Sequence, residues 1–159
     1  MITRILGIDP GSRITGFGII ERHRQQSVYV TSGCIRTQSK LMPQRLQEIY
    51  TGLTQIIEQY QPTISAIEQV FVHRNVASAL KLGQARGVAI LACVQHNLTV
   101  HEYAPTQIKQ AVVGNGHAEK IQVQQMVKIL LSLSKMPQVD AADGLAAALC
   151  HAHHSSYVS

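Results

Sequence analysis

The sequence predicts an α/β fold, a mixed five-stranded β-sheet flanked by helices, and two observations lead to this prediction. Three strand-like segments joined by short turns come first, which is typical of an antiparallel meander. Strand-like and helix-like segments then alternate, which is typical of parallel strands joined by right-handed crossovers. The chain has 159 residues and is 45% hydrophobic, so it is long enough to bury one substantial core. We therefore expect a single domain over residues 1–159.

The predicted strands are apolar runs bounded by turn residues. The first run ends at Asp9, and a tight turn follows at 10–13 because proline fixes φ and glycine admits positive φ. The polar segment 23–26 predicts a hairpin between the second strand and the third. From first to last, the predicted strands are 3–9, 14–21, 27–36, 63–68 and 98–103.

The predicted helices are segments whose apolar residues recur at helical spacing. Pro43 opens the first helix, and Pro62 bars its continuation. The later helices are predicted at 76–96, 105–113, 119–131 and 137–154. The second of these contains Gly83 and Gly87, and each glycine weakens an isolated helix by up to about 1 kcal/mol. We interpret these glycines as a stripe of small residues where another backbone approaches closely. That backbone belongs either to the protein's own sheet or to a second copy in a symmetric dimer.

Four acidic side chains adjoin core-forming segments. Asp9 ends the first predicted strand and Glu68 ends the fourth. If these strands are parallel neighbours, about 4.8 Å apart, both carboxylates lie at the edge of the sheet where ligands gather. Asp140 and Asp143 are three residues apart and share one face of the last helix. We expect Pro137 to set that helix's first turn, which places both acids near its N-terminus.

These four carboxylates predict a metal site. A carboxylate beside the core costs free energy unless it is paired, hydrogen-bonded or metal-bound, and four together repel one another. Oxygen-only ligands favour Mg²⁺, with Mn²⁺ as a substitute, over zinc. Two such ions about 3.5–4 Å apart can activate a water and stabilise the leaving oxygen in phosphodiester hydrolysis. The acids therefore predict metal-dependent phosphodiester chemistry, although they do not decide the substrate.

The charge balance and the cysteines limit the partners and the compartment. Fourteen Lys and Arg stand against nine acids, so a metal site that holds four acids leaves a strongly basic body. Such a body suits a polyanionic partner. Cys34, Cys93 and Cys150 form no Cys-x-x-Cys pair, so we expect reduced, buried thiols. The sequence begins with no secretory pattern, and we expect no apolar stretch of about 20 residues. These features predict a cytoplasmic protein without a membrane partner.

Four sequence motifs carry a family resemblance. They are Leu-Gly-Ile-Asp-Pro-Gly-Ser-Arg at 6–13, Ala-Ile-Glu-Gln-Val-Phe at 66–71, Ala-Leu-Lys-Leu-Gly-Gln-Ala-Arg-Gly at 79–87 and Ala-Ala-Asp at 141–143. In this order and spacing, they resemble the RuvC family of bacterial Holliday junction resolvases over nearly the whole chain. The resemblance implies a ribonuclease H-like fold and a homodimer.

The resemblance also implies an activity. Members of the family are magnesium-dependent endodeoxyribonucleases that make paired nicks across four-way DNA junctions in recombination and repair. The family works with a branch-migration motor of the RuvA and RuvB type. Its catalytic, metal-binding carboxylates match Asp9, Glu68, Asp140 and Asp143 in this chain. The expected cofactor is two Mg²⁺ ions per active site.

Further residues are candidates for DNA contacts. The resemblance favours Phe71 as a ring that stacks on an unpaired base, whereas its type alone would favour a core residue. It also places DNA-contacting lysines at Lys109 and Lys120, positions where a solvated surface charge is the alternative. We assign Arg74 to DNA binding as well, although the loop 72–75 differs in composition from close relatives. The chain lacks the basic tail of some relatives, so we expect weaker non-specific binding.

The histidines divide into two groups. His117 lies in a glycine-rich loop, and we expect it to support the active site or contact a phosphate. His151, His153 and His154 lie near the end of the sequence, where we expect solvated side chains in a fraying terminus rather than a metal site.

Three other functions are compatible with parts of the sequence. Actin-like ATPases share the strand–Asp–x–Gly turn at residues 9–11, but they need a second domain to enclose the nucleotide. A structure-specific binding protein without activity would be expected to lack one of the four acids. A ribonuclease that acts on RNA–DNA hybrids remains open, because the carboxylates would serve it equally.

Overall fold

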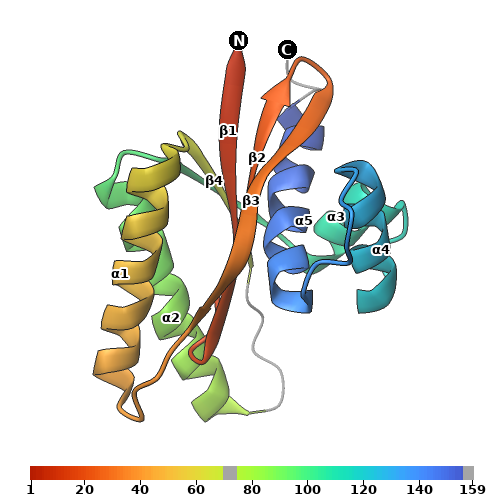
Figure 1. Cartoon of the computed structure of the whole chain (residues 1–159). Helices are drawn as coiled ribbons and strands as arrows, with labels where there is room; N and C mark the ends of the chain where they lie inside the picture. Colours follow the sequence, from red (N-terminus) through yellow and green to blue (C-terminus); the bar gives the residue numbers. More distant parts are fainter. Residues whose placement is uncertain (70–74, 156–159) are drawn as a thin grey trace.

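The computed structural model describes residues 1–69 and 75–155. Within them, five strands form one sheet in the order β3-β2-β1-β4-β5 (Figure 1). The strands are β1 (Ile2–Asp9), β2 (Ile14–His23), β3 (Gln26–Arg36), β4 (Ile64–Glu68) and β5 (Thr99–Tyr103). The helices are α1 (Met42–Tyr60), α2 (Val76–Gln95), α3 (Pro105–Val113), α4 (Lys120–Leu130) and α5 (Val139–His154). The predicted strands and helices are all confirmed, with small shifts at their ends.

The sheet has the mixed topology that the sequence predicts. β1 pairs antiparallel with β2 and parallel with β4, and β4 pairs parallel with β5. The β1–β4 ladder ends at the pair Ile8–Ile67, one residue before Asp9 and Glu68. Both acids therefore lie at the carboxyl edge of two adjacent parallel strands.

The helices form a layer on each face of the sheet (Figure 1). α1 and α2 pack on one face, where Leu6 and Ile8 of β1 point. α3, α4 and α5 pack on the other face, where Ile5 points. Neighbouring β1 residues thus serve two cores, because successive side chains of a strand point to opposite faces.

α5 lies in backbone contact with the two central strands because glycines face it. A Cβ on Gly7 would meet the Gly144 carbonyl oxygen at 1.9 Å, and one on Gly16 would meet the Asp140 carbonyl oxygen at 1.9 Å. A Cβ on Gly144 would lie 2.7 Å from the Cα of Phe17. This close packing brings the first turn of α5 to the end of β1. One detail is wrong: α5 begins at Val139 after the N-cap Gln138, so Pro137 precedes the helix rather than setting its first turn.

The two faces of α2 differ. Ala85, Ala89 and Cys93 are buried against the protein's own core, whereas Gly83 and Gly87 are exposed with no atom within 4 Å of an added Cβ. The two glycines therefore make no close approach to the protein's own sheet. By length and composition alone, α2 could cross a membrane, a test that core helices of soluble proteins also pass. The expectation that no apolar stretch reaches that length is wrong for this helix.

The end of α5 also corrects a prediction. His151 is buried, its Nδ1 lies 2.7 Å from the hydroxyl oxygen of Tyr103, and its ring lies 4.3 Å from that of His101. Burial, followed by the neighbouring His101, lowers the pKa of His151 to about 4. The expectation of solvated histidines in a fraying terminus is therefore wrong for His151, because α5 continues to His154 and this turn packs against β5. Of the cysteines, Cys93 and Cys150 are buried as expected, but Cys34 is only half-buried.

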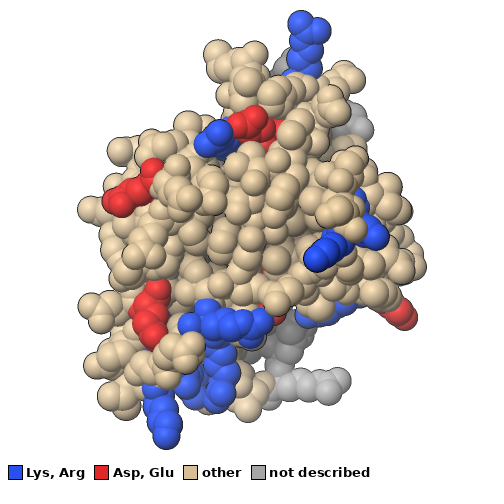
Figure 2. Space-filling view, viewed as in Figure 1, with Lys and Arg blue, Asp and Glu red and all other residues tan. Residues whose placement is uncertain are grey.

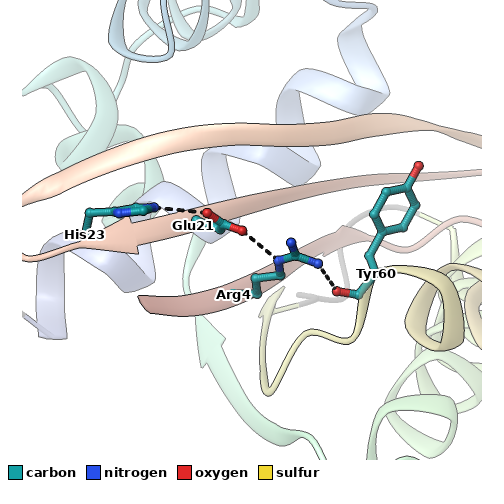
Figure 3. Close-up of polar contacts among 4 residues, drawn as sticks. All are labelled: Arg4, Glu21, His23 and Tyr60. Carbon is teal, nitrogen blue, oxygen red and sulfur yellow. Dashed lines mark hydrogen bonds and ion pairs between the residues drawn. The ribbon is translucent and has the colours of Figure 1, made fainter. Parts of the chain in front are cut away.

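A polar network joins β1, β2 and α1 towards the end of the sheet opposite Asp9 (Figure 3). Arg4 Nε donates to Glu21 Oε1 at 2.8 Å, and Arg4 Nη1 donates to the Tyr60 carbonyl oxygen at 2.5 Å. His23 Nε2 lies 3.0 Å from the other carboxylate oxygen of Glu21. The hydrogen bond with His23, followed by that from Arg4, lowers the pKa of Glu21.

Candidate active site

Three aspartates meet at the carboxyl end of β1. Asp9 is the last residue of β1, Asp140 lies in the first turn of α5, and Asp143 follows one turn later. One carboxylate oxygen from each lies within 4.8 Å of the others. The i, i+3 spacing of the α5 acids puts both beside Asp9, because the helix backbone touches the strands there. Three of the four predicted carboxylates are therefore within reach of one cation.

Glu68 lies beside this cluster but outside the group of three. It ends β4 and lines a cavity of about 260 Å³ together with Asp9 and Asp143. Pro105, Ile108, Val123 and Ala146 form the apolar part of the lining. Three of the four predicted acids therefore line this cavity, with Glu68 on the β4 side, and Asp140 lies beside two of them in the group of aspartates. The cavity has an acidic side and an apolar lining supplied by α3, α4 and α5.

Burial and mutual repulsion raise the pKa values of the clustered carboxyl groups. Burial, followed by the carboxylates of Asp143, Glu68 and Asp140, raises the pKa of Asp9 to about 8, against an opposing effect of Lys120. Burial also raises the pKa of Asp143, although Lys120 opposes it and a hydrogen bond with Asp9 lowers it. Burial and then Asp143 raise the pKa of Glu68. Without a cation, burial and the neighbouring carboxylates therefore favour the protonated form of Asp9.

Two lysines line the same cavity. Lys109 comes from α3, and Lys120 is the first residue of α4, as predicted. The Lys120 ammonium lies 4.0 Å from Asp143 Oδ2, and its side chain is 74% exposed. Both lysines lower the pKa of Glu68. The cavity therefore presents carboxylates and ammonium groups together, an arrangement that suits a phosphate with its metal ions.

The remaining predicted residues lie away from the cavity or cannot be placed. His117 is exposed and is not part of the cavity lining; its backbone N–H donates to Asn115 Oδ1 at 2.9 Å. The position therefore gives no support for a role of His117 in the active site. Phe71 and Arg74 lie outside the described residues.

Several contacts around the acids escape sequence reasoning. The buried Thr15 donates from Oγ1 to the Gly11 carbonyl oxygen at 2.9 Å, which closes the turn after Asp9. The thiol of Cys34 donates to Gln138 Oε1 at 3.3 Å, at the start of α5. Arg86 Nε donates to the carbonyl oxygen of Glu68 at 3.3 Å. No local pattern signals these contacts, because each joins residues from different elements or loops.

Positive charge gathers near this end of the sheet. Figure 2 shows Lys and Arg side chains concentrated along the lower edge of the displayed face, and Figure 1 shows β1 ending on that side. Arg13 follows β1 and Arg36 ends β3, and both are exposed. A basic edge beside an acidic cavity agrees with the charge distribution that the sequence predicts.

Comparisons with known proteins agree with one another. The family model described as crossover junction endodeoxyribonuclease RuvC matches residues 5–151. Relatives of that name include one from Dichelobacter nodosus, 61% identical over 96% of this chain and 87% of the relative. One from Vibrio vulnificus is 58% identical over 94% of this chain and 86% of the relative. A solved structure of Thermus thermophilus RuvC with a Holliday junction substrate matches with a TM-score of 0.90 and 30% identity, over 98% of this chain and 96% of the other.

Proposed function

The chain belongs to the RuvC family of crossover junction endodeoxyribonucleases, and we propose that it resolves four-way DNA junctions by metal-dependent cleavage during recombination and repair. Its ribonuclease H-like fold, a mixed five-stranded sheet between two helical layers, agrees with this membership. The observation that carries the proposal is the convergence of Asp9, Asp140 and Asp143 at the end of β1, with Glu68 lining one cavity with Asp9 and Asp143.

The acidic cluster fits hard divalent cations. Its donors are carboxylate oxygens, the ligands that Mg²⁺ and Mn²⁺ prefer. The raised pKa of Asp9 supports the fit, because a cation would remove the repulsion that now keeps a proton there. We propose that Asp9, Glu68, Asp140 and Asp143 hold two Mg²⁺ ions per active site, and that Mn²⁺ can replace them.

Each group of residues has its own task in the proposed reaction. When bound, such ions neutralise charge on the scissile phosphate and lower the pKa of a water molecule. Asp9 and Asp143 would act as ligands in their ionised forms, so metal binding would oppose the rise in their pKa values. Lys109 and Lys120 offer ammonium groups to phosphates of the bound strand from α3 and α4. The carboxylates would thus hold the ions that contact the reacting phosphate, and the lysines would contact other phosphates of the bound strand.

A homodimer fits the exposed face of α2. Four apolar side chains on this face are exposed by 52–67%, in one stripe with the open Gly83 and Gly87. They are Val76, Leu80, Leu91 and Val94. Their spacing follows a heptad-like pattern, which suits packing against another helix. We propose that a second copy covers this stripe, because two symmetric nicks in one junction require two identical active sites.

Other partner assignments rest on the family. We propose that Phe71 stacks on an unpaired base at the junction centre and that Arg74 contacts DNA. Cooperation with a motor of the RuvA and RuvB type, and a cytoplasmic location, also remain predictions from the resemblance.

Cleavage of defined substrates tests the proposed activity. End-labelled four-way junctions, linear duplexes and RNA–DNA hybrids are incubated with the protein in Mg²⁺, in Mn²⁺ or in EDTA. We expect paired nicks in the junction with either metal and none in EDTA. Asp143→Asn is the matched control: it should bind the junction but cleave it slower by orders of magnitude. Preferential cleavage of the hybrid would refute junction resolution and favour a ribonuclease.

Sedimentation tests the dimer. The protein at micromolar concentration should sediment as a dimer, and Leu80→Asp should make it a monomer without unfolding it. Leu130→Asp, at an exposed leucine of α4, is the control and should leave the dimer intact. A wild-type monomer that still makes paired nicks would show that the α2 stripe has another role.

A further inference from the structure

Arg86 of α2 reaches the point where β4 delivers Glu68 to the cavity. Its Nε donates to the Glu68 carbonyl oxygen at 3.3 Å, and its Nη2 pairs with the carboxylate of Glu102 on β5. The Arg86 side chain is only 18% exposed. These partners stabilise the half-buried cation, because burial of an unpaired charge is costly. The Arg86 side chain therefore links α2 to the ends of β4 and β5, and two contacts fix its position.

The backbone at Glu68 is also held by β5. Glu68 lies opposite Tyr103 in the β4–β5 ladder, and the N–H of Gln69 donates to the Tyr103 carbonyl oxygen at 2.8 Å. The β5 ladder and Arg86 therefore hold the strand at Glu68 together. Glu102, the residue before Tyr103, ties Arg86 to the same strand that holds Gln69.

Glu68 depends on this support more than the aspartates do. Asp140 and Asp143 stand on α5, whose backbone packs against glycines of the central strands. Asp9 precedes a turn that the buried Thr15 closes. Glu68 is the last residue of β4, and its carboxylate borders the cavity from the side, outside the group of three aspartates.

We propose that Arg86 is a positioning residue for Glu68, which sets the distance of the Glu68 carboxylate from Asp9 and Asp143 through the backbone of β4. The proposal rests on the proposed role of the four acids as a metal-binding unit. Arginine suits this task because its planar guanidinium offers donors in two fixed directions, whereas lysine offers a single centre. A misplaced ligand weakens metal binding and slows cleavage without removing any group that reacts.

Three substitutions and one matched control test the proposal. Arg86→Gln removes both contacts, Arg86→Lys can keep only one, and Glu102→Gln keeps an acceptor without its charge. The control is Arg22→Gln. Arg22 is also half-buried, with Nε donating to the Arg24 carbonyl oxygen at 2.9 Å and Nη1 donating to the Ser155 hydroxyl, but it lies towards the other end of the sheet. For each variant we would measure single-turnover junction cleavage across Mg²⁺ concentrations, junction binding in EDTA, and the Mg²⁺-induced rise in melting temperature.

Arg86→Gln should raise the Mg²⁺ concentration for half-maximal cleavage by about 10-fold or more, as loss of a residue behind a metal ligand typically does. It should reduce the Mg²⁺-induced rise in melting temperature and leave junction binding in EDTA unchanged. Arg86→Lys and Glu102→Gln should shift the half-maximal Mg²⁺ concentration less, in the same direction, and Arg22→Gln should not shift it. If Arg86→Gln lowers the melting temperature as Arg22→Gln does but keeps the wild-type Mg²⁺ response, Arg86 is only structural.

The melting-temperature measurement separates this proposal from the proposed function. If the wild-type protein does not cleave junctions, the proposed activity is wrong, but the Mg²⁺-induced rise still reports on Arg86. A normal rise in all three variants would then overturn the positioning role. If Arg86→Gln does not fold, Glu102→Gln tests the proposal instead, because it changes only the partner of the guanidinium. Its Mg²⁺ concentration for half-maximal cleavage and its Mg²⁺-induced rise in melting temperature are then the two deciding measurements.

Discussion

β1 belongs to a charged network towards each of its ends, and the two networks have opposite effects on their acids. Towards its start, Glu21 is hydrogen-bonded to His23 and Arg4, and its pKa is lowered. At its end, Asp9 is buried among other carboxylates, and its pKa is raised to about 8. Similar carboxyl groups on one sheet are thus stabilised as anions at one end and destabilised as anions at the other.

The difference shows what each end contributes. Arg4, Glu21, His23 and the Tyr60 carbonyl join three elements in a network that the protein satisfies alone, so it stabilises the fold. The cluster at Asp9 is left with repulsion that only protons or cations remove, so it costs stability until a metal binds. Unrelieved repulsion among buried carboxylates destabilises the fold, so it indicates a functional site rather than a contribution to folding. Substitutions at the two ends should therefore separate activity from stability.

The largest expected effect is on cleavage. Asp9→Asn removes one ligand of the proposed metal unit while nearly preserving shape, so junction cleavage should fall by orders of magnitude. Glu21→Gln changes an acid of the other network and should leave the cleavage rate unchanged. Single-turnover assays with a labelled junction measure both rates, and binding assays in EDTA should show full affinity for both variants. Loss of cleavage in Glu21→Gln would contradict the division between the two ends.

The second effect is stabilisation by metal. Mg²⁺ at about 100 times its dissociation constant should add about 2.7 kcal/mol to the free energy of unfolding, because it binds only the folded site. Asp9→Asn should lose most of this gain, whereas Glu21→Gln should keep it. Thermal unfolding with and without Mg²⁺ measures the difference. An equal gain in all three proteins would place the metal elsewhere.

The third effect is a pair of opposite pH dependences. Because the pKa of Asp9 is raised in the folded state, Asp9 contributes favourably to the free energy of unfolding at low pH. This contribution is lost as pH rises from about 4 through about 8. Because the folded pKa of Glu21 is lowered, its contribution is present above its unfolded pKa of about 4.5 and is lost as pH falls below it. Asp9→Asn should therefore flatten the decline towards alkaline pH in EDTA, and Glu21→Gln should flatten the decline towards acid.

Unfolding curves from pH 3 to 9 for the two variants and the wild type measure these slopes. Mg²⁺ should also flatten the alkaline decline of the wild type, because it stabilises the ionised acids. An alkaline decline that survives in Asp9→Asn would mean that the cluster does not set it.

Much of the site follows from the sequence because its signals are local. Asp9 and Glu68 each end an apolar strand, and the alternation of strands and helices predicts that these strands are parallel neighbours. The spacing of Asp140 and Asp143 fixes their shared helix face. Each prediction needs only a helical period or the end of a strand. The structure brings Asp9, Asp140 and Asp143 together, and Glu68 lines one cavity with Asp9 and Asp143.

The contacts that escaped prediction depend on how separate elements pack. Gly7 and Gly16 read as ordinary strand residues, yet they let α5 touch the sheet. His151 reads as a terminal residue, yet it is buried under a tyrosine of β5. Arg86 lies in the motif at 79–87, but nothing in the motif indicates that its side chain binds the backbone of Glu68. How closely two elements pack decides whether such residues are buried. The periodicity of hydrophobic residues within one segment carries no information about that distance.

The smallest effect compares one cation from each end. Lys120 is 74% exposed and 4.0 Å from Asp143, so this ion pair should contribute little, and Lys120→Gln should change the free energy of unfolding by about 0.5 kcal/mol or less. Arg4 is 37% exposed and bonds both Glu21 and a backbone carbonyl, so Arg4→Gln should cost about 1 kcal/mol or more. Chemical denaturation measures both.

Junction binding should reverse that order. Lys120 lines the cavity and is free to reach a phosphate, so Lys120→Gln should weaken binding and reduce its salt dependence by roughly one unit of slope. Arg4 lies towards the other end of the sheet, bound to Glu21 and Tyr60, so Arg4→Gln should leave the slope unchanged. Binding in EDTA across a salt series measures both slopes. If Lys120→Gln lowers stability but not the slope, Lys120 serves to neutralise Asp143 within the protein, and the separation of the two ends fails at this residue.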